Sequence, residues 1–219
     1  MKSTNTDRDS TKVAQILFDV GAVIFRPLQP FKFDSGILSP VYVDNRLLIS
    51  YPKQRNKILK YLIAKVNKVG QPDVIAGVAT AGITHAAWIA QELDLPMVYV
   101  RPKPKDHGRQ NQVEGLIRKG QKVIVIEDMV STAESSINVI NVLRKLGAKV
   151  NDEIAIYTHR MPESEKNFKK AKVKFHPLTN LQKVAEVAQV QGFLKREQIQ
   201  IILDWAKDPQ NWGKKRGFE

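Results

Sequence analysis

The stretch that decides the fold runs from Val123 to Ser136 and reads VIVIEDMVSTAESS. It opens with four β-branched apolar residues, a pattern typical of a buried parallel strand. Two adjacent acids, Glu127 and Asp128, follow, and then a Ser/Thr-rich turn. Apolar residues recur at helical spacing after the turn. The stretch therefore predicts a strand over residues 122–126, a turn, and a helix over residues 134–146.

The chemistry of this stretch suits a sugar phosphate. Open α/β sheets bind ligands beyond the carboxyl ends of their strands, which is where the two acids would lie. The free N–H groups at the start of a helix bind phosphate. The acids would then take ribose hydroxyls and the turn a 5′-phosphate. The alternative is an ordinary α/β connection in which Asp and Ser only cap a helix, and this segment alone does not decide between the two.

The composition is that of a globular protein. The 219 residues are 42% hydrophobic and 26% charged, and they suffice for one large α/β domain. No apolar run reaches the length of a membrane span, and residues 1–10 are polar, so we expect neither a membrane segment nor a signal peptide. Cysteine is absent, which excludes disulfides and fits a reducing cytoplasm.

The chain carries a formal net charge of +13. Such an excess suits a pocket for anionic small molecules as well as a nucleic-acid surface. The basic residues are spread along the chain, and no helix–turn–helix, zinc or basic-zipper signature appears. We therefore expect no specific binding of nucleic acid.

Strands and helices alternate through the middle of the chain, which predicts βαβ units and a parallel sheet. Helical spacing predicts a first helix that includes Val20 and Ile24 and ends before Pro27, and a second between Pro52 and Gly70. The alternating part comprises strands over 73–79, 97–100, 122–126 and 153–158, with helices over 83–93 and 134–146. The last third is predicted to hold a short strand at 173–175 and helices near 180–190 and 196–206. We expect a single domain over residues 1–219.

Three further segments carry candidate chemistry. The loop 101–115 has four cations and one His within nine residues and could close over a polyanion, although alone it could equally be a solvated basic loop. The turn at 78–83 has small residues that let a backbone approach an anion, and His85 just after it is expected to be structural. The segment 31–46 combines aromatic residues with Ser-Gly and Ser-Pro turns.

Together these segments resemble the orotate phosphoribosyltransferases, over nearly the whole chain from about residue 11. Segment 31–46 resembles the hood of that family, 76–83 its diphosphate-binding turn, 101–108 its catalytic loop, and 127–135 its motif for phosphoribosyl diphosphate (PRPP). The resemblance implies the parallel-sheet type I phosphoribosyltransferase fold, an α/β fold with an N-terminal helix and hood. Its parts would be the helix and hood at about 11–50, the PRPP-binding core at about 70–160 and the C-terminal helices at about 175–212.

The same resemblance implies an activity and a set of site residues. Ribose 5-phosphate would pass from PRPP to orotate, giving orotidine 5′-monophosphate and diphosphate in pyrimidine biosynthesis, with Lys105, His107 and Asp128 as catalytic residues. PRPP would be bound by Arg101, Lys105, His107, Glu127, Asp128, Met129, Val130, Ser131, Thr132, Ala133, Glu134 and Ser135. Orotate would contact Ser35, Gly36, Tyr42, Val43 and Ser131.

The resemblance also implies partners. Mg²⁺ would be the cofactor, held mainly by PRPP, with no metal ligand assigned to the protein. The enzyme would be a cytoplasmic homodimer whose loop reaches the neighbouring site, with no membrane partner. Two alternatives remain open: a purine-type phosphoribosyltransferase, which shares the PRPP motif but has no need of the hood, and an RNA-binding regulator on the same fold, which would account for the positive charge.

The chain departs from the usual pattern of the family at five positions: Asp34, Ala81, Pro102, Ala133 and Glu134. The family usually has Gly at position 133 and often at 134. An Ala at position 133 is expected to take a helix-start conformation and not a left-handed one. Glu134 suits the helix dipole but would repel a phosphate if its side chain pointed inward.

Overall fold

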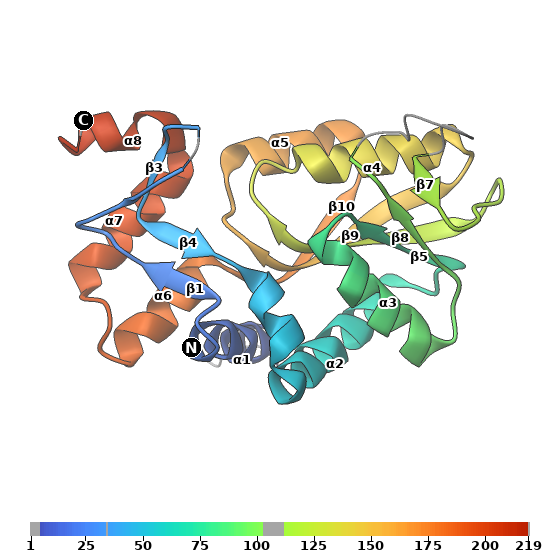
Figure 1. Cartoon of the computed structure of the whole chain (residues 1–219), viewed down its shortest axis with the longest axis horizontal. Coiled ribbons are helices and arrows are strands. Elements are labelled where there is room, and N and C mark those ends of the chain that lie inside the picture. The colour runs from blue at the N-terminus through green and yellow to red at the C-terminus, as the bar shows by residue number, and fades with distance from the viewer. Residues whose placement is uncertain (1–4, 34, 103–111, 219) are drawn as a thin grey trace.

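A six-stranded, mostly parallel sheet forms the centre of the protein, with helices on both faces (Figure 1). The computed structural model describes residues 5–33, 35–102 and 112–218. The strands, in spatial order, are β10 (Lys174–Asn180), β9 (Lys149–Thr158), β8 (Lys122–Val130), β5 (Val74–Val78), β6 (Met97–Val100) and β7 (Val113–Glu114). All neighbours pair in parallel except β7, which runs antiparallel to β6. The predicted α/β fold with a parallel sheet is confirmed.

Two helical layers cover the sheet, which explains why β8 reads as an unbroken apolar run. One layer consists of α1 (Asn5–Asp19), α2 (Pro52–Val69) and α3 (Ala81–Leu93), and the other of α4 (Glu134–Lys145) and α5 (Pro162–Ala171). Ile124 and Ile126 of β8 belong to the core under the first layer, whereas Val123 and Val125 belong to the core under the second. Alternate side chains of a strand point to opposite faces, so both sets must be apolar here.

A smaller unit lies beside the sheet, at the left of Figure 1. It contains two hairpin-like pairs, β1 (Val23–Phe25) with β4 (Val41–Val43) and β2 (Phe31–Lys32) with β3 (Leu38–Ser39), followed by the 3-10 helix η1 (Asn45–Ser50). The C-terminal helices α6 (Leu181–Val190), α7 (Arg196–Lys207) and α8 (Pro209–Lys215) pack with it. The indole Nε1 of Trp205 on α7 donates a hydrogen bond to the carbonyl of Leu38, 3.0 Å away. The two ends of the chain thus build the predicted hood together.

The prediction that the first helix continues through Val20 to Ile24 is wrong. The helix ends at Asp19, and Ile24 belongs to β1. Gly21 takes φ of 72°, and the next amide, that of Ala22, turns back to bond the carbonyl of Leu17 at 2.9 Å. Glycine adopts this left-handed conformation without a steric penalty and commonly ends helices.

The end of β8 was also placed wrongly. The predicted strand stopped at residue 126, but pairing with β9 continues as far as Val130 opposite Thr158. Glu127 and Asp128 therefore lie inside the strand and not in the turn after it. Strand ends are set by the hydrogen bonds of the neighbouring strand, which the local pattern does not contain.

Helix α5 was missed, and β9 and β10 are longer than predicted. Few α5 side chains are buried, chiefly Phe168 and Ser164, so the helix has no apolar stripe to recognise. Its end signals were present: Pro162 at the first position, acids in the first turn and lysines in the last. The lysine run at 169–174 thus ends a helix as well as flanking a strand.

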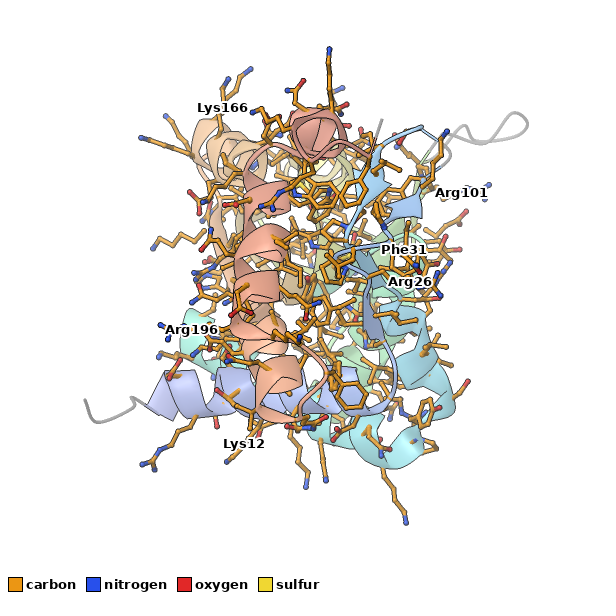
Figure 2. The ribbon with its side chains drawn as sticks, turned by 90° about the vertical axis from the view of Figure 1, so that its left-hand side faces the viewer. Lys12, Arg26, Phe31, Arg101, Lys166 and Arg196 are labelled. Atoms are coloured by element: carbon orange, nitrogen blue, oxygen red, sulfur yellow. The ribbon has the colours of Figure 1, made fainter. Side chains whose placement is uncertain are left out.

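The positive charge is distributed over the surface. Lys12 on α1, Lys166 on α5 and Arg196 on α7 point outward in different directions (Figure 2). Arg26 instead lies over the ring of Phe31, with 4.7 Å between the guanidinium carbon and the ring centre. Among the helices that the structure describes, none combines the length and the apolar character needed to cross a membrane.

The start of α3 lies unusually close to β8. A Cβ atom added to Gly82 would lie 2.5 Å from the carbonyl oxygen of Ile126 and 3.3 Å from the Cα of Glu127. A methyl group at this position would therefore push the helix away from the backbone that carries the two acids.

We expect Gly82→Ala to lower the free energy of unfolding by about 1–3 kcal/mol, the usual range for overpacking, although Ala is the better helix former. Gly192→Ala is the control, because Gly192 has φ of 80° with no atom within 4 Å of an added Cβ, so only backbone strain is introduced. Urea denaturation measures the free energy of unfolding of both variants. Unchanged or increased stability of Gly82→Ala would contradict the close approach.

Candidate functional site

A cavity of about 640 Å³ lies between the hood and the carboxyl end of β8. Its walls come from the hood (Phe33, Ile37, Val41, Tyr42, Val43), from β8 and the turn after it (Met129, Ser131, Thr132), from residues 159 and 161–163, and from residues 205–210. Most of the lining side chains are apolar or aromatic, and a few polar groups face the cavity among them. Such a pocket suits a flat organic ligand oriented by a few hydrogen bonds.

The acid pair lies beside this cavity on β8. Glu127 is buried, and its Oε1 accepts a hydrogen bond of 2.9 Å from the backbone N–H of Asp128. Burial raises the pKa of Glu127 well above its ordinary value, and the neighbouring charge of Asp128 raises it further. Burial also raises the pKa of Asp128, while hydrogen bonds and the charge of Arg46 oppose that rise. The protonation of each carboxyl group thus affects the pKa of the other. A ligand with hydroxyl donors is a suitable partner for the pair.

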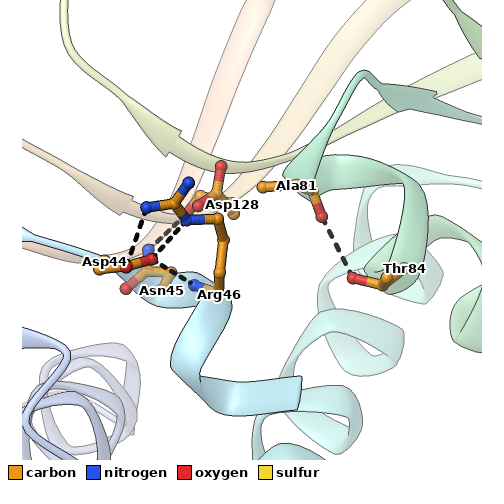
Figure 3. Close-up of polar contacts among 6 residues, drawn as sticks. All are labelled: Asp44, Asn45, Arg46, Ala81, Thr84 and Asp128. Carbon is orange, nitrogen blue, oxygen red and sulfur yellow. Dashed lines mark hydrogen bonds and ion pairs between the residues drawn. The ribbon is translucent and has the colours of Figure 1, made fainter. Parts of the chain in front are cut away.

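The hood holds the acid pair from one side (Figure 3). Asn45 is buried, and its Nδ2 donates to the backbone carbonyl of Asp128 at 2.9 Å. Arg46 reaches toward Asp128 while its Nε and one terminal nitrogen bond the carboxylate of Asp44 at 2.6 and 2.9 Å. These bonds lower the pKa of Asp44. Asn45 had been assigned to the hood without a role, because no local pattern reveals a contact 83 residues away.

The turn after β8 leads into α4 through a left-handed residue. Ala133 has φ of 69° and ψ of 12°, so the expectation that it would avoid this conformation is wrong. The conformation costs an L-residue about 1–2 kcal/mol, and contacts of the turn must offset it. One is the hydrogen bond from Nδ2 of Asn167 on α5 to the carbonyl of Thr132, at 2.9 Å. Glu134 and Ser135, the first residues of α4, have exposed side chains.

Both helices that begin near the acid pair lack a side-chain cap. Neither Ala133 before α4 nor Thr80 before α3 makes a capping hydrogen bond with its side chain. In the first turn of α3 the Oγ1 of Thr84 donates a hydrogen bond to the carbonyl of Ala81, 3.2 Å away, and this bond takes up none of the free N–H groups (Figure 3). Uncapped first turns leave backbone N–H groups free to bind an anion. The site thus offers two such helix starts next to two carboxyl groups.

A second buried acid lies under the turn. Glu153 in β9 is fully buried, and its Oε1 accepts a hydrogen bond of 2.6 Å from Oγ of Ser136 in the first turn of α4. Its Oε2 has no hydrogen-bond partner among the residues that the structure describes. Burial raises the pKa of Glu153 to about 8. No local pattern in the sequence predicts this contact, because a single acid within a strand is ordinarily an exposed residue.

A histidine was missed at the cavity wall. The Nδ1 of His159 lies 3.1 Å from the hydroxyl of Tyr157, and its ring packs edge-on against Trp205, with 5.0 Å between ring centres. Burial lowers the pKa of His159 to about 3, so the imidazole is neutral at physiological pH. His85 in α3 is likewise buried, with its pKa lowered to about 4, as expected of a structural histidine.

The predicted site residues fall into four groups. Tyr42, Val43, Met129, Ser131 and Thr132 line the cavity, and Glu127, Asp128, Val130, Ala133, Glu134 and Ser135 belong to the same strand and turn. Three are placed elsewhere: Ser35 and Gly36 form the turn between β2 and β3, next to the lining residues, and Arg101 directly follows β6, 3.5 Å from the carboxylate of Glu114. Lys105 and His107 lie outside the described residues.

In the part of the chain that the structure describes, the acid pair is not joined by further side chains into a ligand set for a metal ion. Within residues 5–33, 35–102 and 112–218, no three His, Asp or Glu side chains gather in a way that could hold one.

The chain is similar to known proteins over nearly its full length. Residues 51–190 match the phosphoribosyl transferase domain family. Proteins named orotate phosphoribosyltransferase from Coxiella burnetii and Listeria monocytogenes are 44% and 45% identical over 93% of this chain and 98% of theirs. The crystal structure of orotate phosphoribosyltransferase from Aeropyrum pernix superposes with a TM-score of 0.70, at 30% identity over 84% of this chain and 99% of that one.

The buried Glu153 predicts a pH dependence of stability. Its pKa rises from 4.5 to about 8 on folding, so the stabilisation tied to its proton is full below pH 4.5 and is lost as the pH rises through about 8. Glu153→Gln removes this titration. The parent should lose stability as the pH rises from about 5 to about 8, and the variant should not. We therefore expect the free energy of unfolding of the variant, relative to that of the parent, to increase by at least about 1 kcal/mol over this range. Urea denaturation across this range measures the difference, and a difference that does not change with pH would contradict the protonated carboxyl.

Proposed function

The chain belongs to the phosphoribosyl transferase domain family and, within it, to the orotate phosphoribosyltransferases, and from this membership we propose how its residues divide the reaction. The enzyme transfers ribose 5-phosphate from PRPP to orotate, giving orotidine 5′-monophosphate and diphosphate in pyrimidine biosynthesis. One observation carries the residue assignment: the acid pair and the uncapped start of α4 lie beside a cavity that the hood closes. The hood favours orotate over the purine-type alternative, which has no need of it.

Asp128, with Glu127, would bind the ribose hydroxyls of PRPP. Cleavage of the bond between the anomeric carbon and diphosphate leaves an oxocarbenium-like centre. A fixed negative charge nearby stabilises such a centre more than it stabilises the substrate, and that difference lowers the barrier. The bond from Asn45 to the carbonyl of Asp128 supports this role, because it fixes the backbone that carries the charge.

The turn from Ser131 to Ser135 would hold the 5′-phosphate. Free amides at the start of α4 and the hydroxyls of Ser131, Thr132 and Ser135 are suitable donors. The exposed side chain of Glu134 is compatible with a bound phosphate, because it does not need to face the turn. Met129, Val130 and Ala133 would contribute backbone groups.

The diphosphate would leave toward the loop 101–115 and the start of α3. Arg101, Lys105 and His107 would neutralise its charge, with Lys105 making the largest contribution. Mg²⁺ would enter as part of the PRPP complex, with most of its shell supplied by PRPP oxygens and water. The uncapped first turn of α3 offers further N–H donors.

Orotate would lie in the cavity between the hood and β8. Tyr42 and Val43 would contact its ring, Ser131 would bind one of its polar edges, and the turn at Ser35 and Gly36 would close the end of the cavity. These assignments are supported by the apolar walls and by the position of Ser131 between the cavity and the phosphate-binding turn.

The enzyme would work as a homodimer in the cytoplasm. The cysteine-free sequence supports a reducing compartment. The shared-site arrangement, in which the loop with Lys105 serves the neighbouring subunit, is taken from the family resemblance.

We expect orotate absorbance to fall only when PRPP and Mg²⁺ are both present. The assay compares orotate with adenine, hypoxanthine and uracil at equal concentration. The alternative of a purine-type enzyme would be favoured by equal or faster turnover of a purine base. Tight, sequence-dependent binding of RNA in a filter assay at near-physiological salt, without turnover, would favour the regulator.

The shared site predicts complementation between two impaired variants. Lys105→Ala and Asp128→Asn should each lower kcat by about 10²-fold or more, if they act like other preorganised charges. Mixing them in equal amounts should restore about a quarter of the parental activity, because half of the dimers are hybrids with one intact site of two. Native mass spectrometry supplies the control that hybrids form. Hybrids without recovered activity would show that the loop serves its own subunit.

A further inference from the structure

The first turn of α4 is held in place without a side-chain N-cap. Helices are normally held at their start by a side chain at the N-cap, which takes up one or two of the free N–H groups. Here the N-cap is Ala133, which makes no such bond, so the N–H groups remain available for a phosphate. The orientation of the turn must then be fixed by contacts that do not use those N–H groups.

Ser136 supplies such a contact from below the turn. It is the third residue of α4, it is buried, and its hydroxyl points into the protein, where it donates to Oε1 of Glu153 at 2.6 Å. Glu153 is in the middle of β9, where its backbone pairs with Val125 of β8 on one side and with Phe175 of β10 on the other. A side chain on a strand flanked on both sides is a rigid anchor.

Stability alone does not account for this carboxyl group. Glu153 is fully buried, and within the described part of the chain its Oε2 has no hydrogen-bond partner. An unpaired buried polar atom lowers stability, and replacing both members of a buried polar pair by apolar groups is often neutral or stabilising. Because the buried carboxyl group lowers stability, we look for a role of Glu153 in function.

We propose that Glu153 is a positioning residue for PRPP: through Ser136 it holds the first turn of α4 against the sheet in the geometry that the 5′-phosphate requires. The inference rests on the proposed assignment of that phosphate to residues 131–135. Loss of the contact lets the turn shift relative to β8. The phosphate then loses hydrogen bonds, while the hood wall of the orotate cavity, which belongs to other elements, stays in place.

Three variants separate this role from a purely structural one. Ser136→Ala removes the donor, Glu153→Met removes the acceptor and the unpaired oxygen, and Glu153→Gln keeps an acceptor for Ser136. We expect the first two to raise the KM for PRPP about tenfold, equivalent to about 1.4 kcal/mol. They should raise the Kd of ribose 5-phosphate by a similar factor while changing the KM for orotate less than about twofold. Glu153→Gln should stay close to the parent.

Thermal stability is expected to respond differently from PRPP binding. The double variant Ser136→Ala/Glu153→Met should leave Tm unchanged or raise it, because it removes both members of the buried polar pair, whereas Glu153→Met alone leaves the buried Ser136 hydroxyl without its partner. The double variant Ser136→Ala/Glu153→Met should bind PRPP no worse than either single variant, because both remove the same contact. Ser164→Ala is the matched control: Ser164 is the buried third residue of α5, and its hydroxyl bonds the carbonyl of Met161 at 2.7 Å.

The outcomes are distinct. A PRPP KM within about twofold of the parent in both Ser136→Ala and Glu153→Met would overturn the inference. So would a PRPP KM that rises only in step with a fall in Tm, or one that rises equally in Ser164→Ala. Should Glu153→Met fail to fold, Ser136→Ala and Glu153→Gln still decide the matter. A parent protein without PRPP-dependent turnover of orotate would instead overturn the proposed function.

Discussion

The site depends on keeping two adjacent carboxyl groups in place at the end of a buried strand, although burial opposes their ionisation. Glu127 bonds the backbone N–H of Asp128, and Asn45 bonds its carbonyl. Arg46 offsets part of the charge. Because Asn45 and Arg46 belong to the hood, the hood wall of the cavity and the acid pair form one connected structure. A change in the hood is therefore expected to affect PRPP as well as orotate.

Several features near this pair lower the stability of the fold and support the geometry that we propose for binding. The helices α3 and α4, which start near the pair, lack side-chain caps, Ala133 takes a conformation that glycine adopts more easily, and Glu153 has an unpaired oxygen in the described core. Each feature costs stability, and each leaves N–H groups free or fixes their direction. Strain and unpaired polar groups commonly gather at functional sites for this reason.

The general fold was accessible from the sequence because it follows from local pattern. Unbroken Val/Ile runs indicate strands buried on both faces, and helices between them force a parallel sheet. The errors have local causes as well. The first helix was extended through Gly21, whose left-handed backbone ends it, and α5 was missed because a surface helix without an apolar stripe leaves only its end signals. The roles predicted for Lys105 and His107 stay predictions.

The sequence by itself determined the family and the parallel sheet, and it identified the stretch from Glu127 to Ser135 as a candidate site. These conclusions depend on residues that are neighbours in the chain. Only the tertiary structure decided that β8 continues to Val130, that Ala133 is left-handed, that Asn45 bonds the carbonyl of Asp128, and that Ser136 bonds Glu153. Strand ends depend on the partner strand, and backbone strain depends on what surrounds a turn. Asn45 and Asp128 are 83 residues apart, and Ser136 and Glu153 belong to different elements. No local rule connects such residues until the sheet has brought them together.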